Sequence, residues 1–226
     1  MIEIISLNKH YGSHQVLDNV GLVFEDGHVY GVVGENGAGK TTLFKCIAGL
    51  EKYTGEIKSG FDRLKNHLGF LATEPFFSPK MTGREYIRLL CNARGIKDVN
   101  ADEKNIFDLP LDQYASTYST GMKKKLALLA ILMQKNEVFV LDEPFNGVDI
   151  QSNILITAII HELKRLGKTV IISSHIFSTL SDTSDEIFLL KEGKIVRRVL
   201  KDEFHALEEE MKGIMIGNKI EKLGLQ

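Results

Sequence analysis

The sequence has no tryptophan, only two cysteines and four prolines among its 226 residues, and no long hydrophobic run. Cys46 and Cys91 lie in apolar helical runs without metal-binding or disulfide spacing, so we expect reduced thiols in the core. The longest apolar runs, residues 126–133 and 154–160, are far shorter than the ~20 residues that a membrane-spanning helix needs. A function at a membrane would therefore require a separate partner that spans it.

A marked excess of charge of one sign is also absent. The formal net charge of -2 provides no bulk attraction to nucleic acid or anionic lipid, so no nucleic-acid partner is expected. Residues 1–12 lack a basic flank before an apolar stretch, which argues against a signal peptide. A chain of this length with 43% hydrophobic residues is expected to form a single α/β domain over residues 1–226.

Hydrophobic periodicity predicts strands that alternate with helices. Strands are predicted at residues 2–7, 29–33, 68–71, 138–141 and 170–173, with a final hairpin of residues 186–191 and 194–200. Helices are predicted at residues 40–50, 84–94, 120–133 and 151–166, and more weakly at 204–211. This order predicts a mostly parallel sheet with an antiparallel β portion. Residues 76–133 show no convincing strand and are interpreted as an inserted α-helical subdomain.

A glycine-rich segment follows the strand at residues 29–33 and opens the next helix. Its residues fit the phosphate-binding pattern GxxxxGK[ST]: Gly34, Glu35, Asn36, Gly37, Ala38, Gly39, Lys40 and Thr41, with Thr42 next in the helix. Glycines allow backbone amides to surround a polyphosphate, and the helix N-terminus adds partial positive charge. Lys40 would reach the β and γ phosphates of ATP, and the Thr41 hydroxyl would bind Mg²⁺. The alternative interpretation is a structural turn.

Two carboxylates follow the apolar strand at residues 138–141. Asp142 and Glu143 would lie at the C-terminal edge of a parallel sheet, where ligands bind. We expect Asp142 to hold the metal, directly or through a water, and Glu143 to orient the attacking water. Pro144 helps to end the strand, so that the two side chains can take separate roles. An acidic surface turn is the alternative interpretation.

Between these two motifs, the segment Tyr118-Ser119-Thr120-Gly121-Met122 opens a helix. It is similar to the signature motif of the ABC (ATP-binding cassette) ATPase family, with Thr120 in place of a glycine and Met122 in place of a glutamine. With the phosphate loop and the paired acids, the sequence resembles this family over essentially its whole length. The resemblance implies that Ser119 and Gly121 contact nucleotide, whereas the alternative for Ser119 is a simple helix N-cap.

Other positions extend the resemblance or depart from it. His175, after the strand at residues 170–173, matches the family's switch histidine and would act on the γ-phosphate. Tyr11 resembles the aromatic residue that stacks on adenine; the alternative is an aromatic residue at a strand end. At the position of the family's glutamine after the third core strand stand Thr73 and Glu74, which leaves open whether either contacts the metal.

The resemblance implies a P-loop NTPase core that uses ATP and Mg²⁺, with Lys40, Glu143 and His175 in catalysis. It also implies a homodimer, or a heterodimer with another ABC ATPase subunit, on the cytoplasmic face of the cell membrane. This dimer would power separate transmembrane subunits, and residues 81–90 are similar to export-type cassettes. Two alternatives remain: a soluble ABC ATPase that acts on DNA or ribosomes, and a weakly hydrolysing regulatory module.

Overall fold

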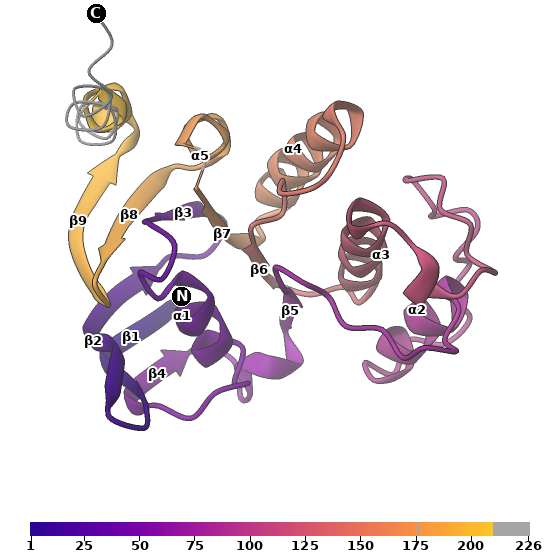
Figure 1. Cartoon of the computed structure of the whole chain (residues 1–226), viewed down its shortest axis with the longest axis horizontal. Helices are drawn as coiled ribbons and strands as arrows, with labels where there is room; N and C mark the ends of the chain where they lie inside the picture. The colour runs from indigo at the N-terminus through magenta and orange to yellow at the C-terminus, as the bar shows by residue number, and fades with distance from the viewer. Residues whose placement is uncertain (176, 210–226) are drawn as a thin grey trace, which may run out of the picture.

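A six-stranded sheet forms the centre of the computed structural model, which describes residues 1–175 and 177–209 (Figure 1). Neighbouring strands pair parallel, except for the last two, which form the predicted antiparallel hairpin. The order across the sheet is β5 (Leu68–Leu71), β6 (Val138–Asp142), β7 (Thr169–Ser174), β3 (Val29–Val33), β8 (Glu186–Lys191) and β9 (Lys194–Leu200). The predicted α/β class with a mostly parallel sheet is confirmed.

A second sheet of three antiparallel strands has the order β2 (His14–Phe24), β1 (Ile2–Tyr11) and β4 (Thr54–Ser59). The prediction was wrong here, because it ended β1 at residue 7 and contained neither β2 nor β4. Irregular register between β1 and β2, with positive φ at Ser6 (47°) and Asn19 (50°), breaks the two-residue alternation. β4 has no fully buried residue, so it carries no hydrophobic pattern.

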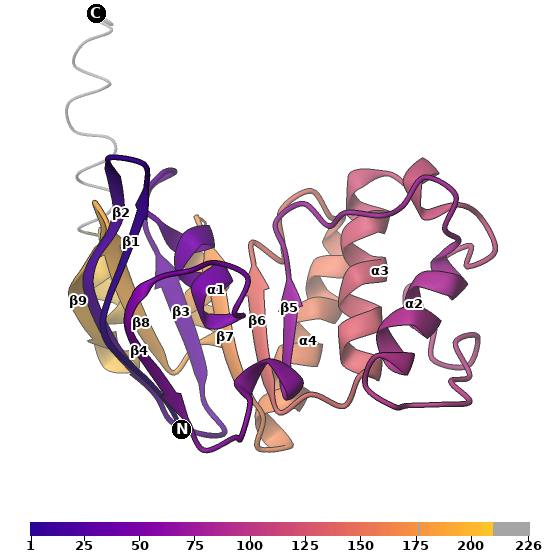
Figure 2. The same cartoon turned by 90° about the horizontal axis from the view of Figure 1, so that it is seen from below.

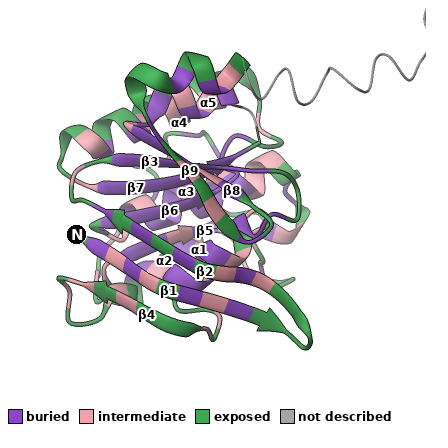
Figure 3. Ribbon diagram, turned by 90° about the vertical axis from the view of Figure 1, so that its left-hand side faces the viewer, coloured by how far each residue is buried: buried purple, intermediate pink, exposed green. Residues whose placement is uncertain are grey.

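Helices fill both faces of the six-stranded sheet. α1 (Lys40–Ile47) packs between the two sheets, whereas α3 (Thr120–Met133), α4 (Ile150–Arg165) and α5 (Phe177–Thr183) cover the opposite face (Figure 1). The central strands are accordingly buried along their length, as Figure 3 shows for β3, β6 and β7. Burial on both faces explains why these strands read as continuous apolar runs in the sequence.

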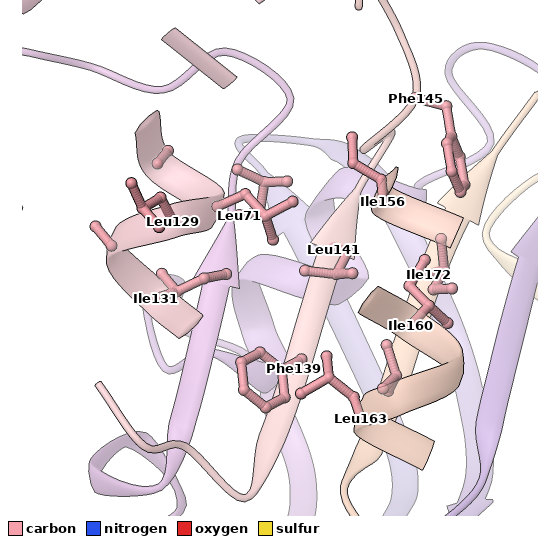
Figure 4. Packing of buried hydrophobic residues seen from close by; sticks show 14 of the residues in the cluster. Leu71, Leu129, Ile131, Phe139, Leu141, Phe145, Ile156, Ile160, Leu163 and Ile172 are labelled. Atoms are coloured by element: carbon pink, nitrogen blue, oxygen red, sulfur yellow. The ribbon is translucent and has the colours of Figure 1, made fainter. Parts of the chain in front are cut away.

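Alternate side chains of β6 supply the two cores. Val138 and Val140 belong to the core around α1, and Phe139 and Leu141 belong to the core on the other face. Figure 4 shows Phe139 and Leu141 between the side chains of α3 and those of α4, including Ile160. The last residue of β6, Asp142, is thereby held at a fixed place on the sheet edge.

The helices α2 (Gly83–Asn92) and α3 lie together beyond β5 (Figures 1 and 2). α3 has the predicted bounds, and α2 begins one residue earlier and ends two residues earlier than predicted. Residues 76–133, all of which are described, contain an isolated bridge between Thr82 and Tyr114 but no named strand. The helical character of this stretch was predicted correctly, whereas its status as an inserted subdomain stays a prediction.

Several helix ends differ from the prediction. α1 stops at Ile47 rather than residue 50, because Gly49 adopts a left-handed conformation (φ 71°) that ends the helix. α4 is shifted by one residue, and α5 was not predicted. Residues 204–209 are helical, and the rest of the helix predicted at 204–211 lies outside the described residues. Short 3₁₀ turns occupy Leu64–Asn66, Ala115–Thr117 and Lys201–Glu203.

Two findings bear on the cysteines and on membrane insertion. Cys46 and Cys91 are buried and free, and burial raises the pKa of the Cys46 thiol to about 11. Both thiols lie in the core without a disulfide, as predicted. Among residues 1–175 and 177–209, every helix is too short or too polar to cross a bilayer.

The core of α4 offers a stability test. Ile160 is fully buried and Ile154, on the same helix, is 67% exposed. We expect Ile160→Ala to lower the free energy of unfolding by about 2–5 kcal/mol, because it leaves a cavity against the sheet. The matched control Ile154→Ala should change it by less than about 0.5 kcal/mol. Equal effects of the two substitutions in urea unfolding would contradict the packing described here.

Candidate nucleotide site

The loop between β3 and α1 has a backbone that only glycine can form at several positions. Gly37 (φ 86°) and Gly39 (φ 108°) are in the left-handed region. A Cβ on Gly34 would lie 2.3 Å from the carbonyl oxygen of Leu190, and one on Gly39 would lie 2.9 Å from Leu17 Cδ2. The three glycines of the predicted pattern are therefore required by the conformation of the loop.

This loop ends at the N-terminus of α1 without a side-chain cap. Gly39 is the N-cap, and the first turn has no acidic side chain, so its amides remain available to an anion. The buried Lys40 ammonium donates to the carbonyl oxygens of Gly34 (2.7 Å) and Glu35 (3.2 Å). The loop thus combines unpaired helix amides with a cation that lies over its backbone.

Asp142, at the end of β6, has a fully buried carboxylate surrounded by hydroxyl groups. Its Oδ2 accepts hydrogen bonds from Thr41 Oγ1 (2.7 Å) and Thr73 Oγ1 (2.5 Å), and its Oδ1 accepts one from Ser173 Oγ (2.6 Å). The sequence alone leaves the role of Thr73 open and does not identify Ser173. Glu74, the other open candidate, is absent from the lining of the adjacent cleft.

Glu143 follows Asp142 in a left-handed conformation (φ 52°), which is uncommon for a residue other than glycine. This turn directs its side chain away from the environment of Asp142. Glu143 Oε2 lies 2.8 Å from His175 Nδ1, and Oε1 lies 3.9 Å from Lys40 Nζ. The backbone amide of Glu143 donates to Ser173 Oγ (2.9 Å). The two adjacent carboxylates therefore have separate partners, as the predicted separation of their roles requires.

Most of these groups meet at a cleft of about 500 Å³, whose lining does not include the predicted Gly34, Ala38 and Asp142. Of the predicted site residues, Glu35, Asn36, Gly37, Gly39, Lys40, Thr41, Thr42, Glu143 and His175 line it. Thr73, Asn146, His14 and Val16 also line the cleft. The last two come from β2, which the sequence did not reveal, so nothing in the pattern could place His14 here.

Tyr11, the last residue of β1, lies at the margin of this region. The residue is 46% exposed, and Lys9 Nζ lies 4.5 Å from the centroid of its ring. Lys9 in turn donates a hydrogen bond to Glu51 (2.9 Å). Burial and a hydrogen bond with Glu51 raise the pKa of the phenol, and a hydrogen bond with Thr42 acts the other way. The contact with Thr42 puts the ring beside the helix that follows the phosphate loop.

Ser119 and Gly121 are not among the residues that line the cleft. Ser119 is exposed and caps α3, because its hydroxyl accepts from the Met122 amide (3.2 Å). Gly121 packs against the loop after β6, where an added Cβ would lie 2.6 Å from the carbonyl oxygen of Gly147. The N-cap interpretation of Ser119 is therefore correct as local structure. A nucleotide role for the motif would require a nucleotide held by another chain.

The oxygen-rich surroundings of Asp142 are compatible with magnesium. Mg²⁺ prefers oxygen ligands and is commonly bound by one or two carboxylates together with substrate phosphates and water. Asp142 and the Thr41 hydroxyl provide such oxygens beside the phosphate loop. No group of three or more His, Cys, Asp or Glu residues suited to a metal occurs in the described part of the chain. A metal here would therefore depend on oxygens of the bound phosphates.

Comparison with known proteins agrees with this geometry. The sequence model of the family described as ABC transporter matches residues 17–146, more than half of the chain. The chain is 32% identical over 218 residues to the bacitracin transport ATP-binding protein BcrA of Enterococcus faecalis, covering 91% of this chain and 71% of that protein. It is 31% identical over 221 residues to the lantibiotic transport ATP-binding protein SrtF of Streptococcus pyogenes, covering 92% and 95%.

A solved structure shares the fold. It is described as the dimeric, post-hydrolysis state of the ATP-binding cassette MJ0796 bound to ADP and Pi. The TM-score is 0.79 with 20% sequence identity, over 89% of this chain and 99% of that chain. At that identity, the likeness establishes the fold alone.

Ser173 provides a test of the contacts around the paired acids. We expect Ser173→Ala to lower the free energy of unfolding by about 1–3 kcal/mol, because it removes the partner of Asp142 Oδ1 and of the buried Glu143 amide. Ser178→Ala, at an exposed position of α5, is the control and should be nearly neutral. A neutral Ser173→Ala in chemical denaturation would contradict this arrangement.

Proposed function

The chain belongs to the ABC transporter family and is an ATP-binding ATPase, and from this premise we propose that it powers export by separate membrane-spanning subunits. The observation that carries the proposal is the meeting of the phosphate loop and the paired acids. Thr41 bonds Asp142, and Glu143 lies between Lys40 and His175, all beside one cleft. Two relatives are named for transport of bacitracin and of a lantibiotic.

The residues of the cleft would divide the hydrolysis of ATP among them. The amides at the start of α1 and the Lys40 ammonium would hold the β and γ phosphates. Glu143 would orient a water molecule for attack on the γ-phosphate, and His175 would hold Glu143 and contact the transferred group. When bound, Mg²⁺ supplies charge neutralisation on the phosphates, and Asp142 with Thr41 would hold it. Tyr11 would stack on the adenine from the margin of the cleft.

A dimer would complete the site. Ser119 and Gly121 lie outside the cleft of their own chain, at the exposed N-terminus of α3. In a head-to-tail pair, these residues of one copy, or of a homologous subunit, would face the nucleotide of the other. ATP would then stabilise the dimer from within the interface, and loss of the γ-phosphate would release it.

Membrane-spanning subunits would dock on the helical region. A groove of about 780 Å³ lies beside α2 and is lined by Ser78, Pro79, Lys80, Met81, Glu85, Arg88, Leu89 and Asn92. Leu89 is 52% exposed there, and Phe76, shortly before the groove residues in the sequence, is 83% exposed. Exposed apolar side chains beside a concave surface are typical of protein interfaces. This docking would hold the chain at the cytoplasmic face of the membrane.

Glu143→Gln tests the assignment of the general base. We expect ATP binding to be kept and the steady-state rate of phosphate release to fall by roughly 100-fold or more, because the amide cannot accept the proton of water. The nucleotide-bound dimer should persist in size-exclusion chromatography. Glu137→Gln, at the opposite end of β6, is the control and should hydrolyse ATP normally. Rapid hydrolysis by Glu143→Gln would remove this residue from the proposed role.

Lys40→Ala tests the phosphate loop. We expect the affinity for ATP to fall by about tenfold or more, since a charge-assisted contact with phosphate is worth about 1.5–3 kcal/mol. The control Lys45→Ala, in the last turn of the same helix, should bind ATP normally. Isothermal titration with a non-hydrolysable ATP analogue measures both, and equal affinities would contradict the assignment.

Purification from native membranes tests the transport proposal. We expect the chain to copurify with a multi-span membrane protein in mild detergent, and Leu89→Glu in the groove to abolish this association while leaving the fold intact. Association with ribosomes or DNA instead, with no membrane protein present, would support a non-transport ATPase and contradict this proposal.

A further inference from the structure

A buried lysine outside the cleft contacts the backbone of the turn that begins at Glu143. Lys124 of α3 is 1% exposed, and its Nζ donates to the carbonyl oxygens of Glu143 (2.7 Å) and Asn146 (2.9 Å). In the sequence, Lys124 is the middle residue of a run of three lysines, residues 123–125, of the kind that usually lies on a solvated helix face. The structure instead directs the middle lysine into the core, toward the loop that carries the two acids.

The burial of this ammonium group calls for an explanation. A buried charge is costly unless it is well hydrogen-bonded, and a neutral side chain could fill the same space without this cost. Burial lowers the pKa of the Lys124 ammonium, whereas the negative charges of Glu143, Asp142 and Glu74 raise it in part. What Lys124 provides in return is two charge-assisted bonds to backbone oxygens, which are stronger than neutral ones.

Those bonds act on a backbone that is otherwise unfavourable. Glu143 has a φ of 52° and precedes Pro144, and residues other than glycine hold such a conformation only when their surroundings fix it. Ser173 binds the Glu143 amide and Lys124 binds its carbonyl, so both ends of this residue are fixed by buried side chains. The direction of the Glu143 carboxylate toward His175 follows from this backbone.

We propose that Lys124 is a positioning residue for ATP hydrolysis, which holds the left-handed turn that aims the Glu143 carboxylate at its water. The inference rests on the proposed role of Glu143. Two neighbouring contacts join the same two segments, because Gly121 packs on Gly147 and Lys125 pairs with Asp149 (3.2 Å). These contacts fasten α3 to the loop, whereas Lys124 alone among them reaches Glu143.

Lys124→Met tests this inference, since methionine fills a similar volume without a donor. We expect kcat to fall by about tenfold or more, while KM and the affinity for a non-hydrolysable ATP analogue stay within about twofold. Lys124→Gln, which keeps an N–H donor, should recover part of the lost rate. Lys123→Met, one position earlier on α3 and partly exposed, is the matched control and should keep the wild-type rate.

Each result decides the question. Wild-type kcat in Lys124→Met, or parallel losses of affinity and kcat, would overturn the positioning role; if that variant does not fold, Lys124→Gln decides by the same criteria. A crystal structure of the variant gives a readout independent of hydrolysis, in which the His175–Glu143 contact should be lost, and its retention would refute the inference. Rapid ATP hydrolysis by Glu143→Gln would contradict the proposed role of Glu143. The structural readout would still test whether Lys124 holds the turn.

Discussion

The buried carboxylate of Asp142 is the constraint on which the arrangement of the site depends. An ionised carboxylate with no exposed surface is stable only if its oxygens accept hydrogen bonds. Those bonds come from the start of α1, the segment after β5 and the strand β7, through Thr41, Thr73 and Ser173. The three segments must therefore be correctly placed before Asp142 can be accommodated. The parallel register that pairs Asp142 with Ser173 supplies one of these placements directly. The strand order β5-β6-β7 therefore determines the geometry of the site.

The parts of the fold that could be predicted from the sequence are those in which burial dictates the pattern. β3 and β5 were predicted with correct bounds because strands covered on both faces are continuous apolar runs. The antiparallel sheet escaped prediction for two physical reasons. Irregular register at Ser6 and Asn19 disturbs the alternation in β1 and β2, and β4 has no fully buried side chain to mark a face. Pairing between segments, rather than any local preference, creates these strands.

The same distinction applies to the site. The phosphate loop is one run of neighbouring residues, and the paired acids are another. The chemistry of each could therefore be predicted from its own short segment of sequence. Ser173, Lys124 and His14 are single polar residues in strands or helices, and only tertiary packing brings them to the acids or the cleft. Thr73 was a candidate because of its position, yet its contact with Asp142 Oδ2 depends on the fold. The Thr73 hydroxyl and the Thr41 hydroxyl both donate to Asp142 Oδ2, and neither adds a negative charge to that of the carboxylate.

The loop of residues 143–149 connects two regions that would serve different nucleotides in the proposed dimer. At its start, Glu143 lies in the cleft of its own chain, and at Gly147 it packs against Gly121, whose motif would face the partner's nucleotide. The contact between these glycines leaves no room for a side chain, so the N-terminus of α3 cannot come closer without moving the loop. Asp149 anchors the far end by capping α4, and its bonds with Ser152 hold the pKa of that carboxyl below its usual range. If engagement of one nucleotide by α3 favours alignment of Glu143 at the other in the proposed dimer, then alignment of Glu143 must favour that engagement by the same free energy, because coupling free energies are reciprocal. Hydrolysis in such a dimer would then depend on both chains, with Lys40, Glu143 and His175 supplied by one chain and Ser119 and Gly121 by the other.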